Sequence, residues 1–269
     1  MRRRALISVL VAVPLVALAV AAALAWWPDS LPEPLAAPTE PVLPDLALSP
    51  LDDFTAGVAD DGDLSVRFTA SIGNVGAGPF IVYAVRADDR GDWRVSQRFR
   101  EQNGPTSELE IPGTMVFGGH GHEHWHVELG ASYWLTRPGS ASVLRKYEKV
   151  GYCFFDQVRL PVPGPAPVAP TFGKDACDGQ GSLALEMGLS PAFGDPYPWT
   201  LPDQRLLVNG LPNGVYRLWA DADPAHLFRE SDETNNRTWV DLRLTLTTRP
   251  PRVEVVRRGP AGAPAPAAG

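Results

Sequence analysis

The chain has 269 residues, which is enough for one well-buried domain with tails or for two small domains. Its formal net charge of −7 makes nucleic acid a poor partner, because the phosphate backbone attracts basic surfaces. The chain contains 28 Pro and 25 Gly residues and few helix-favouring runs beyond residue 27, so short strands and many turns are expected.

The first 27 residues have the pattern of an export signal or a membrane anchor. Three arginines at positions 2–4 precede an unbroken apolar run over residues 5–27. Ala23 and Ala25 suit a cleavage site, but the run is also long enough to cross a bilayer as a helix. Both alternatives predict an exported protein that is extracellular or at the cell surface, either released after cleavage or attached to the membrane.

The remainder divides into three parts. Residues 28–42 are Pro-rich and are expected to form an extended linker. Residues 43–256 carry the apolar patterning of a folded domain. Residues 257–269 are rich in Pro, Ala and Gly and predict a disordered tail with nothing to bury.

Within the folded part, apolar and polar residues alternate in short bursts that end at Gly, Pro, Asn or Asp. The bursts are LSVRFTASIGN at 64–74 and further segments at 79–88, 131–139, 214–223 and 237–248. They predict an all-β domain, an antiparallel β-sandwich of roughly seven to ten strands with long loops.

The chain has two cysteines, Cys153 and Cys177. In an exported protein such a pair indicates a disulfide, which would close a loop of about 25 residues and contribute roughly 3 kcal/mol on the chain-entropy estimate. The alternative is a pair of free thiols that bind copper.

Four of the five histidines alternate along GGHGHEHWHVE, residues 118–128. If this segment is a strand, His122, His124 and His126 lie on one face, followed by Glu128. Three neutral imidazoles with an open coordination position suit Cu(II) or Zn(II). The alternative is a solvated histidine-rich loop that binds metal incidentally.

Four motifs in order resemble the catalytic domain of the lysyl oxidase family. The longest lies in residues 188–236 and contains Gly-Leu-Ser-Pro, Asp-x-Tyr, a Gln seven residues on, a Gly-x-Tyr strand and Glu-Ser-Asp-x-Thr-Asn-Asn. The others are HEHWH, similar to a copper-binding His-x-His-x-His, together with KVGYCFFD at 149–156 and LPDL at 43–46. The resemblance covers roughly residues 43–245.

This resemblance implies a copper amine oxidase that carries a lysyl tyrosylquinone. By matching position, Lys149 and Tyr197 would form the quinone, and His122, His124 and His126 would bind Cu(II). Such an enzyme oxidises a primary amine, either peptidyl lysine or a small alkylamine, to an aldehyde. Dioxygen is consumed, and ammonia and hydrogen peroxide are released.

Two further residues of the histidine segment receive roles from their position. Members of the family carry an acid shortly after the third histidine, and Glu128 is the candidate catalytic base here. Its alternative role is to orient a ligand imidazole from outside the coordination sphere. His120 is expected to support the ligands rather than to bind the metal.

A second cation site is expected where Glu-Ser-Asp-x-Thr-Asn-Asn gathers oxygen donors in one turn, since such donors suit calcium. The resemblance implies that the opening of the domain completes this site. The alternative is a solvated turn capped by asparagines. The candidate calcium ligands are Asp45, the carbonyl of Leu46, Glu230, Asp232, Asn235 and Asn236.

Two functions remain open from the sequence. The first is the copper-dependent amine oxidase with dioxygen and a primary amine as its substrates. The second is a non-enzymatic, exported immunoglobulin-like module that binds copper or zinc or serves adhesion. The oxidase needs both Lys149 and Tyr197, whereas the module needs neither.

Overall fold

The computed structural model describes residues 40–59, 62–100, 106–118, 123–128, 130–149, 151–163, 167, 169–177, 179–201 and 204–263, without the side chains of Glu148 and Lys149. The predicted signal or anchor at 1–27, most of the predicted linker, His120 and His122 lie outside this part of the chain. Within it, no helix is long and apolar enough to cross a membrane.

The predicted all-β, antiparallel class is confirmed. All strand pairs in the described residues are antiparallel, and the one helical element there is a short 3-10 turn, η1 (Lys174–Cys177). The largest sheet is built on the long strand β3, which pairs with β1, β2, β13 and β14, while β11 pairs with β13. Its strands are β1 (Leu46–Leu48), β2 (Asp52–Val58), β3 (Leu64–Asn74), β11 (Val158–Arg159), β13 (Phe193–Tyr197) and β14 (Arg205–Leu207).

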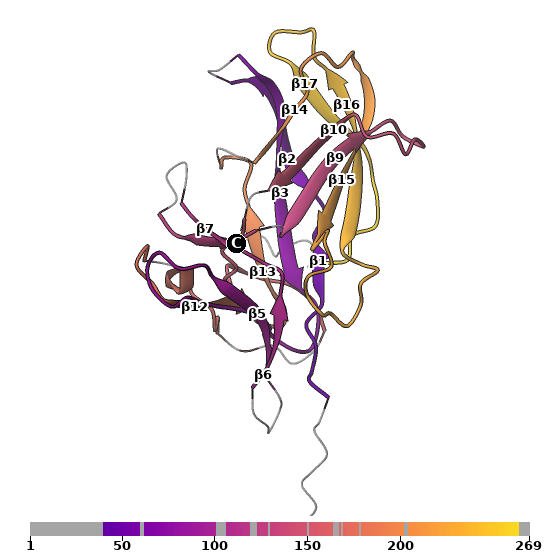
Figure 1. Ribbon diagram of the computed structural model, residues 1–269. Coiled ribbons are helices and arrows are strands. Elements are labelled where there is room, and N and C mark those ends of the chain that lie inside the picture. The colour runs from indigo at the N-terminus through magenta and orange to yellow at the C-terminus, as the bar shows by residue number, and fades with distance from the viewer. Residues whose placement is uncertain are drawn as a thin grey trace, which may run out of the picture. The chain divides into compact units, whose positions relative to one another are not determined.

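Three smaller sheets complete the fold (Figure 1). The five-stranded sheet has the order β10-β9-β15-β16-β17, with β9 (Ala131–Thr136), β10 (Arg145–Lys149), β15 (Gly214–Ala222), β16 (Arg237–Thr245) and β17 (Arg252–Arg258). The four-stranded sheet has the order β12-β4-β5-β6, with β4 (Phe80–Val85), β5 (Arg94–Phe99), β6 (Ser107–Ile111) and β12 (Ala184–Leu189). A two-stranded ribbon pairs β7 (Met115–Phe117) with β8 (Trp125–Val127).

The sheets share one apolar core. Alternate residues of β3, among them Phe68, turn inward, as the period of two requires. The Phe68 ring meets the Tyr133 ring of β9 edge-on, with centroids 5.0 Å apart, so the sheet of β3 and the five-stranded sheet pack through these side chains. Phe80 of β4 packs in the same way between Phe154 and Phe228, at 5.0 and 4.8 Å.

The predicted disulfide between Cys153 and Cys177 is confirmed. Both residues are buried, their Cα atoms are 6.0 Å apart, and neither cysteine is free. The alternative of two thiols that bind copper is therefore wrong. The disulfide ties the segment that follows β10 to the short helix η1.

The ordered chain extends past residue 256, where the folded domain was expected to end. Strand β17 continues to Arg258, and the chain then packs across the sheet of β3 as far as Ala263, which is 2% exposed. The Ala263 N–H donates to the Leu48 carbonyl at 3.1 Å, and the Thr238 hydroxyl donates to the Pro260 carbonyl at 2.9 Å. The sequence predicted no packing for this segment, because its small residues offer little apolar surface. They fit here because the chain runs close to neighbouring backbone.

This packing predicts that Gly262→Ala destabilises the domain. A Cβ at this position would lie 2.2 Å from the Asn235 carbonyl oxygen, so backbone has to move, at a cost of about 1–3 kcal/mol. Gly181→Ala is the matched control, because nothing lies within 4 Å of its Cβ position, and its effect should stay within about 0.5 kcal/mol. Denaturant unfolding measures both, and equal stability of the two variants would contradict the packing of residues 259–263.

Candidate metal and quinone site

The described part of the histidine segment alternates as a strand should. Trp125 and Val127 of β8 are buried, whereas His124 and His126 are partly exposed on the other face. The two imidazole ring centroids lie 4.5 Å apart, with 47° between the ring planes. Glu128 follows, partly exposed, in the turn after β8, where its N–H donates to the Thr114 carbonyl.

An aromatic cluster packs against the buried face of β8. The Trp125 ring packs on Trp93 and Phe117, with centroids 4.9 and 5.2 Å away. The Arg86 guanidinium lies over the Trp93 and Trp125 rings at 4.6 and 4.8 Å, a cation–π arrangement. The Trp125 indole N–H also donates to the Gly179 carbonyl at 2.9 Å. These contacts fix the backbone that carries His124 and His126.

The histidine strand is joined to the segment that contains Lys149. Val127 and Tyr152 form an antiparallel bridge with two backbone hydrogen bonds of 2.9 and 2.8 Å. Gly151 permits this approach, because its φ is +115° and a Cβ there would lie 2.5 Å from the His126 Cβ. Lys149 is the last residue of β10, and its backbone pairs with Ala131 of β9.

Tyr197 lies at the end of β13 and is 8% exposed. Its ring meets the Tyr152 ring edge-on with centroids 4.4 Å apart, and its hydroxyl oxygen accepts the Cys153 N–H at 3.2 Å. Strand β11 pairs with β13 only at Gly194 and Phe193. Pro196 is therefore tolerated, because no strand is paired at the edge of β13 that its missing N–H would face.

A buried polar group surrounds the Tyr197 hydroxyl. Asp195 is fully buried and accepts a hydrogen bond from the Gln157 side-chain amide. The Tyr152 and Tyr133 hydroxyls are hydrogen-bonded to each other at 2.9 Å. Burial raises the pKa of Tyr197 well above its usual value, and the Asp195 carboxylate raises it further, whereas the Cys153 N–H lowers it. Tyr197 is therefore held as a neutral phenol.

The structure also joins two of the sequence motifs through one carboxylate. Asp156, the last residue of KVGYCFFD, is buried and accepts the Ser190 N–H and the Ser190 hydroxyl, both at 2.7 Å. It also accepts backbone N–H groups of Thr171 and Phe172. Asp156 therefore fixes the Gly-Leu-Ser-Pro segment that leads into β13 and Tyr197.

The residues predicted as calcium ligands come together from the two ends of the domain. Asp45 accepts the Asn235 amide at 2.7 Å and the Ser231 hydroxyl at 3.3 Å. Glu230 accepts the backbone N–H of Leu46 and, at 3.0 Å, the amide of Asn236. Asp232 is exposed and caps its own turn, where it accepts the N–H and hydroxyl of Thr234 at 2.8 and 2.6 Å.

Several groups of this cluster lack the partners that burial demands. Burial raises the pKa of Glu230 to about 8 and also raises that of Asp45, with the charge of Asp232 adding to the latter. The side-chain oxygens of Asn235 and Asn236 are buried without a hydrogen-bond donor. Unpaired carbonyl oxygens beside two carboxylates match the donor set that a hard cation prefers.

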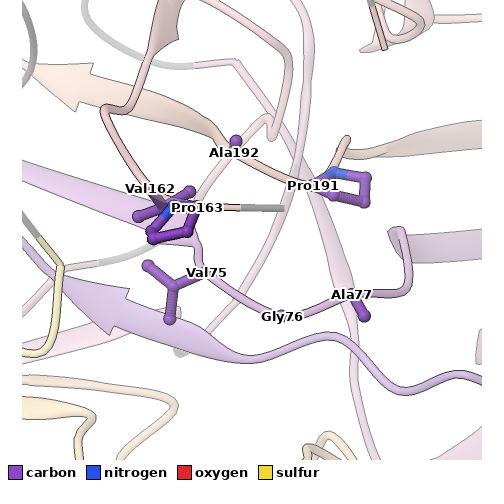
Figure 2. Close-up of a pocket in the computed structure, with 7 residues that line it drawn as sticks. All are labelled: Val75, Gly76, Ala77, Val162, Pro163, Pro191 and Ala192. Atoms are coloured by element: carbon purple, nitrogen blue, oxygen red, sulfur yellow. The ribbon is translucent and has the colours of Figure 1, made fainter. Parts of the chain in front are cut away.

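A surface cavity lies beside the backbone of Asp45, whose carbonyl accepts the Val75 N–H at 2.8 Å. Figure 2 shows its lining, which contains no titratable side chain and consists of Val75, Gly76, Ala77, Val162, Pro163, Pro191 and Ala192. Its walls offer neither a nucleophilic side chain nor a metal ligand.

No group of three or more His, Cys, Asp or Glu side chains that suits a metal ion occurs in the described residues, a set that includes His124 and His126 but not His122. The chain matches no protein-family model and no curated protein sequence.

The polar group near Tyr197 was not predicted from the sequence. Asp195 was visible as the Asp of Asp-x-Tyr, and the period of two already places residues 195 and 197 on one strand face. Gln157, Tyr152 and Tyr133 gave no such signal, because they reach Tyr197 and Asp195 only through tertiary packing.

Proposed function

We propose that this chain is an exported, copper-dependent amine oxidase similar to the lysyl oxidase family. One observation carries the proposal. The Val127–Tyr152 bridge and the Tyr152–Tyr197 ring contact connect the histidine strand, the segment after Lys149 and the Asp-x-Tyr motif. These three motifs are far apart in the sequence, and an oxidase that builds its quinone from Lys149 and Tyr197 beside copper requires them together.

The donor groups on β8 fit the proposed metal. His124 and His126 offer two partly exposed imidazoles on one face, with ring centroids 4.5 Å apart. With His122 as the third ligand, the set suits Cu(II). Bound copper would supply the activation of dioxygen that converts the Tyr197 phenol to a quinone and reoxidises the cofactor after turnover.

The chain's own residues have distinct tasks in this proposal. The Cys153 N–H holds the Tyr197 hydroxyl, and the Tyr152 ring limits how the Tyr197 ring can tilt. Lys149 supplies the amine that joins the tyrosine ring. Glu128 is placed after the histidines to remove a proton from the carbon of the bound amine.

The substrate class follows from the cofactor. An electrophilic quinone reacts with a primary amine, either peptidyl lysine or a small alkylamine, and the products are an aldehyde, ammonia and hydrogen peroxide. The Cys153–Cys177 disulfide agrees with an exported location, where oxidising conditions keep such bonds intact.

We further propose that calcium joins the two ends of the β-sandwich. Asp45, the Leu46 carbonyl, Glu230, Asn235 and Asn236 would hold the ion, with Asp232 at the exposed side of the turn. An ion here would neutralise the buried carboxylates and supply a partner for the asparagine oxygens.

The oxidase predicts a redox-active quinone after copper loading in air. Wild-type protein should give a positive quinone redox-cycling stain, and both Lys149→Ala and Tyr197→Phe should lose it, because each removes half of the cofactor. Lys146→Ala is the control, since Lys146 lies on the same strand and should keep the stain.

Three results of this experiment have different meanings. An unstained wild type would contradict the oxidase and favour the non-enzymatic metal-binding or adhesion module. A stain that survives in Lys149→Ala would instead indicate a quinone made from tyrosine alone. Loss of the stain in Lys146→Ala would show that the effect of Lys149→Ala is not specific to that residue.

Calcium is expected to raise the melting temperature. An ion that binds only the folded state at about 100 times its Kd contributes about 2.7 kcal/mol, and Asp45→Asn should abolish most of this gain. Asp88→Asn, an exposed aspartate elsewhere, should retain it. A melting temperature that calcium leaves unchanged in metal-free wild type would exclude the site.

A further inference from the structure

We propose that the outer face of the five-stranded sheet binds an anionic polysaccharide, a linear polymer of uronic acids. The strands of this sheet lie side by side at the upper right of Figure 1. Its inner face packs in the core, where Tyr133, Leu218 and Val240 are buried. The residues that carry the proposal have no task in the proposed oxidase, so either proposal can fail without the other.

Three tryptophans form a row across the outer face. In the strand register, Trp219 of β15 lies directly opposite Trp134 of β9 on one side and Trp239 of β16 on the other. The Trp134 and Trp219 rings are nearly parallel, with 8° between their planes and centroids 5.9 Å apart, and the Trp239 centroid is 6.2 Å from that of Trp219. All three side chains are partly exposed. A contiguous row of such rings is typical of a binding surface.

Arginine side chains lie against these rings. The Arg217 guanidinium is 3.5 Å and the Arg257 guanidinium 4.9 Å from the centroid of the Trp239 ring, and the Arg237 guanidinium is 5.3 Å from that of Trp134. These cation–π contacts restrict the long arginine side chains. A ligand that binds the guanidiniums therefore loses little affinity to ordering them.

The acids that pair with these arginines lie deeper than the arginines do. The Asp241 carboxylate accepts from Arg217 and Arg257 and is 5% exposed, and the Asp221 carboxylate accepts from Arg237 and is 12% exposed. The Arg257 and Arg237 side chains are 61% and 55% exposed, and within the described residues their Nη1 groups make no hydrogen bond. A ligand from solvent thus meets cations that still have donors for a carboxylate.

The same part of the chain is basic in an otherwise acidic protein. Residues 237–258, which include β16 and β17, contain six arginines and two acids, a net charge of +4, whereas the whole chain has −7. A local excess of this kind attracts polyanions to one face. A uronic acid polymer matches both features of the face, because its carboxylates pair with guanidiniums and its sugar rings pack on indoles.

The first test measures the affinity of the full-length protein for polygalacturonate. The polymer should bind, and the affinity should fall as salt is raised, because exposed charges are screened. Fully methyl-esterified polymer, which has the same sugar without the charge, and polyphosphate, which has charge without a sugar, should each bind about tenfold more weakly or worse. Absent binding of polygalacturonate, or equal binding of polyphosphate, would overturn the proposal. Binding only to vesicles of phosphatidylglycerol would overturn it in favour of a membrane surface.

The second test locates the binding face. The double variant Arg237→Gln and Arg257→Gln should weaken the binding of polygalacturonate about tenfold or more. The matched control is the double variant Arg90→Gln and Arg94→Gln, which removes the same charge from exposed arginines elsewhere and should bind like wild type. Unchanged affinity in the first variant would show that the polymer binds at another place.

A third measurement needs no substitution and decides the question even if the first variant does not fold. Phenylglyoxal modifies exposed arginines, and mass spectrometry maps the modified positions. Saturating polygalacturonate should abolish most of the modification of Arg237 and Arg257 in wild-type protein and leave that of Arg90 unchanged. Equal modification with and without the polymer would overturn this face as the binding site.

Discussion

The site depends on one short antiparallel bridge, the pair of backbone hydrogen bonds between Val127 and Tyr152. On one side of the bridge, His126 directly precedes Val127. On the other side, Tyr152 lies three residues after Lys149 and its ring touches Tyr197. Gly151 is essential to the bridge, since any side chain there would meet His126. A change that breaks this bridge would separate the histidine strand from the segment that joins Lys149 to Tyr197.

The rest of the fold holds that bridge rigid from several directions. The disulfide fixes Cys153 directly after Tyr152, and the Arg86–Trp93–Trp125 cluster fixes the histidine strand. Asp156 holds the loop that leads into β13, so Tyr197 is positioned from its own strand as well. Such support suits a site that must first modify its own side chains. Two residues that are to be joined need a fixed relative position before the cofactor exists.

The buried polar group around Tyr197 is the costly part of this arrangement. Asp195, Gln157 and the tyrosine hydroxyls are removed from water in the middle of the core, where apolar side chains would be more stabilising. Proteins keep such groups where chemistry needs them, which is consistent with a reactive phenol at Tyr197.

The longer strands could be read from the sequence, because apolar alternation at 64–74, 131–136 and 214–222 is strong enough to determine them. Strand β13 could not, since FGDPY contains Gly, Asp and Pro and is a strand only through its pairing with β3. The same limit applies to the site. The histidine alternation was visible locally, whereas the contact of Tyr152 with Tyr197 and the packing of Ala263 arise from tertiary structure.

The central claim is that Lys149 and Tyr197 become one covalent group. Peptide mapping by mass spectrometry of the copper-loaded, air-exposed protein tests it most directly. We expect a cross-linked species that joins the peptide of Lys149 to that of Tyr197. Its mass should equal the sum of the two peptides plus one oxygen, less the displaced hydrogens. It should be absent without copper. Recovery of both peptides unmodified and separate after copper loading would contradict the account.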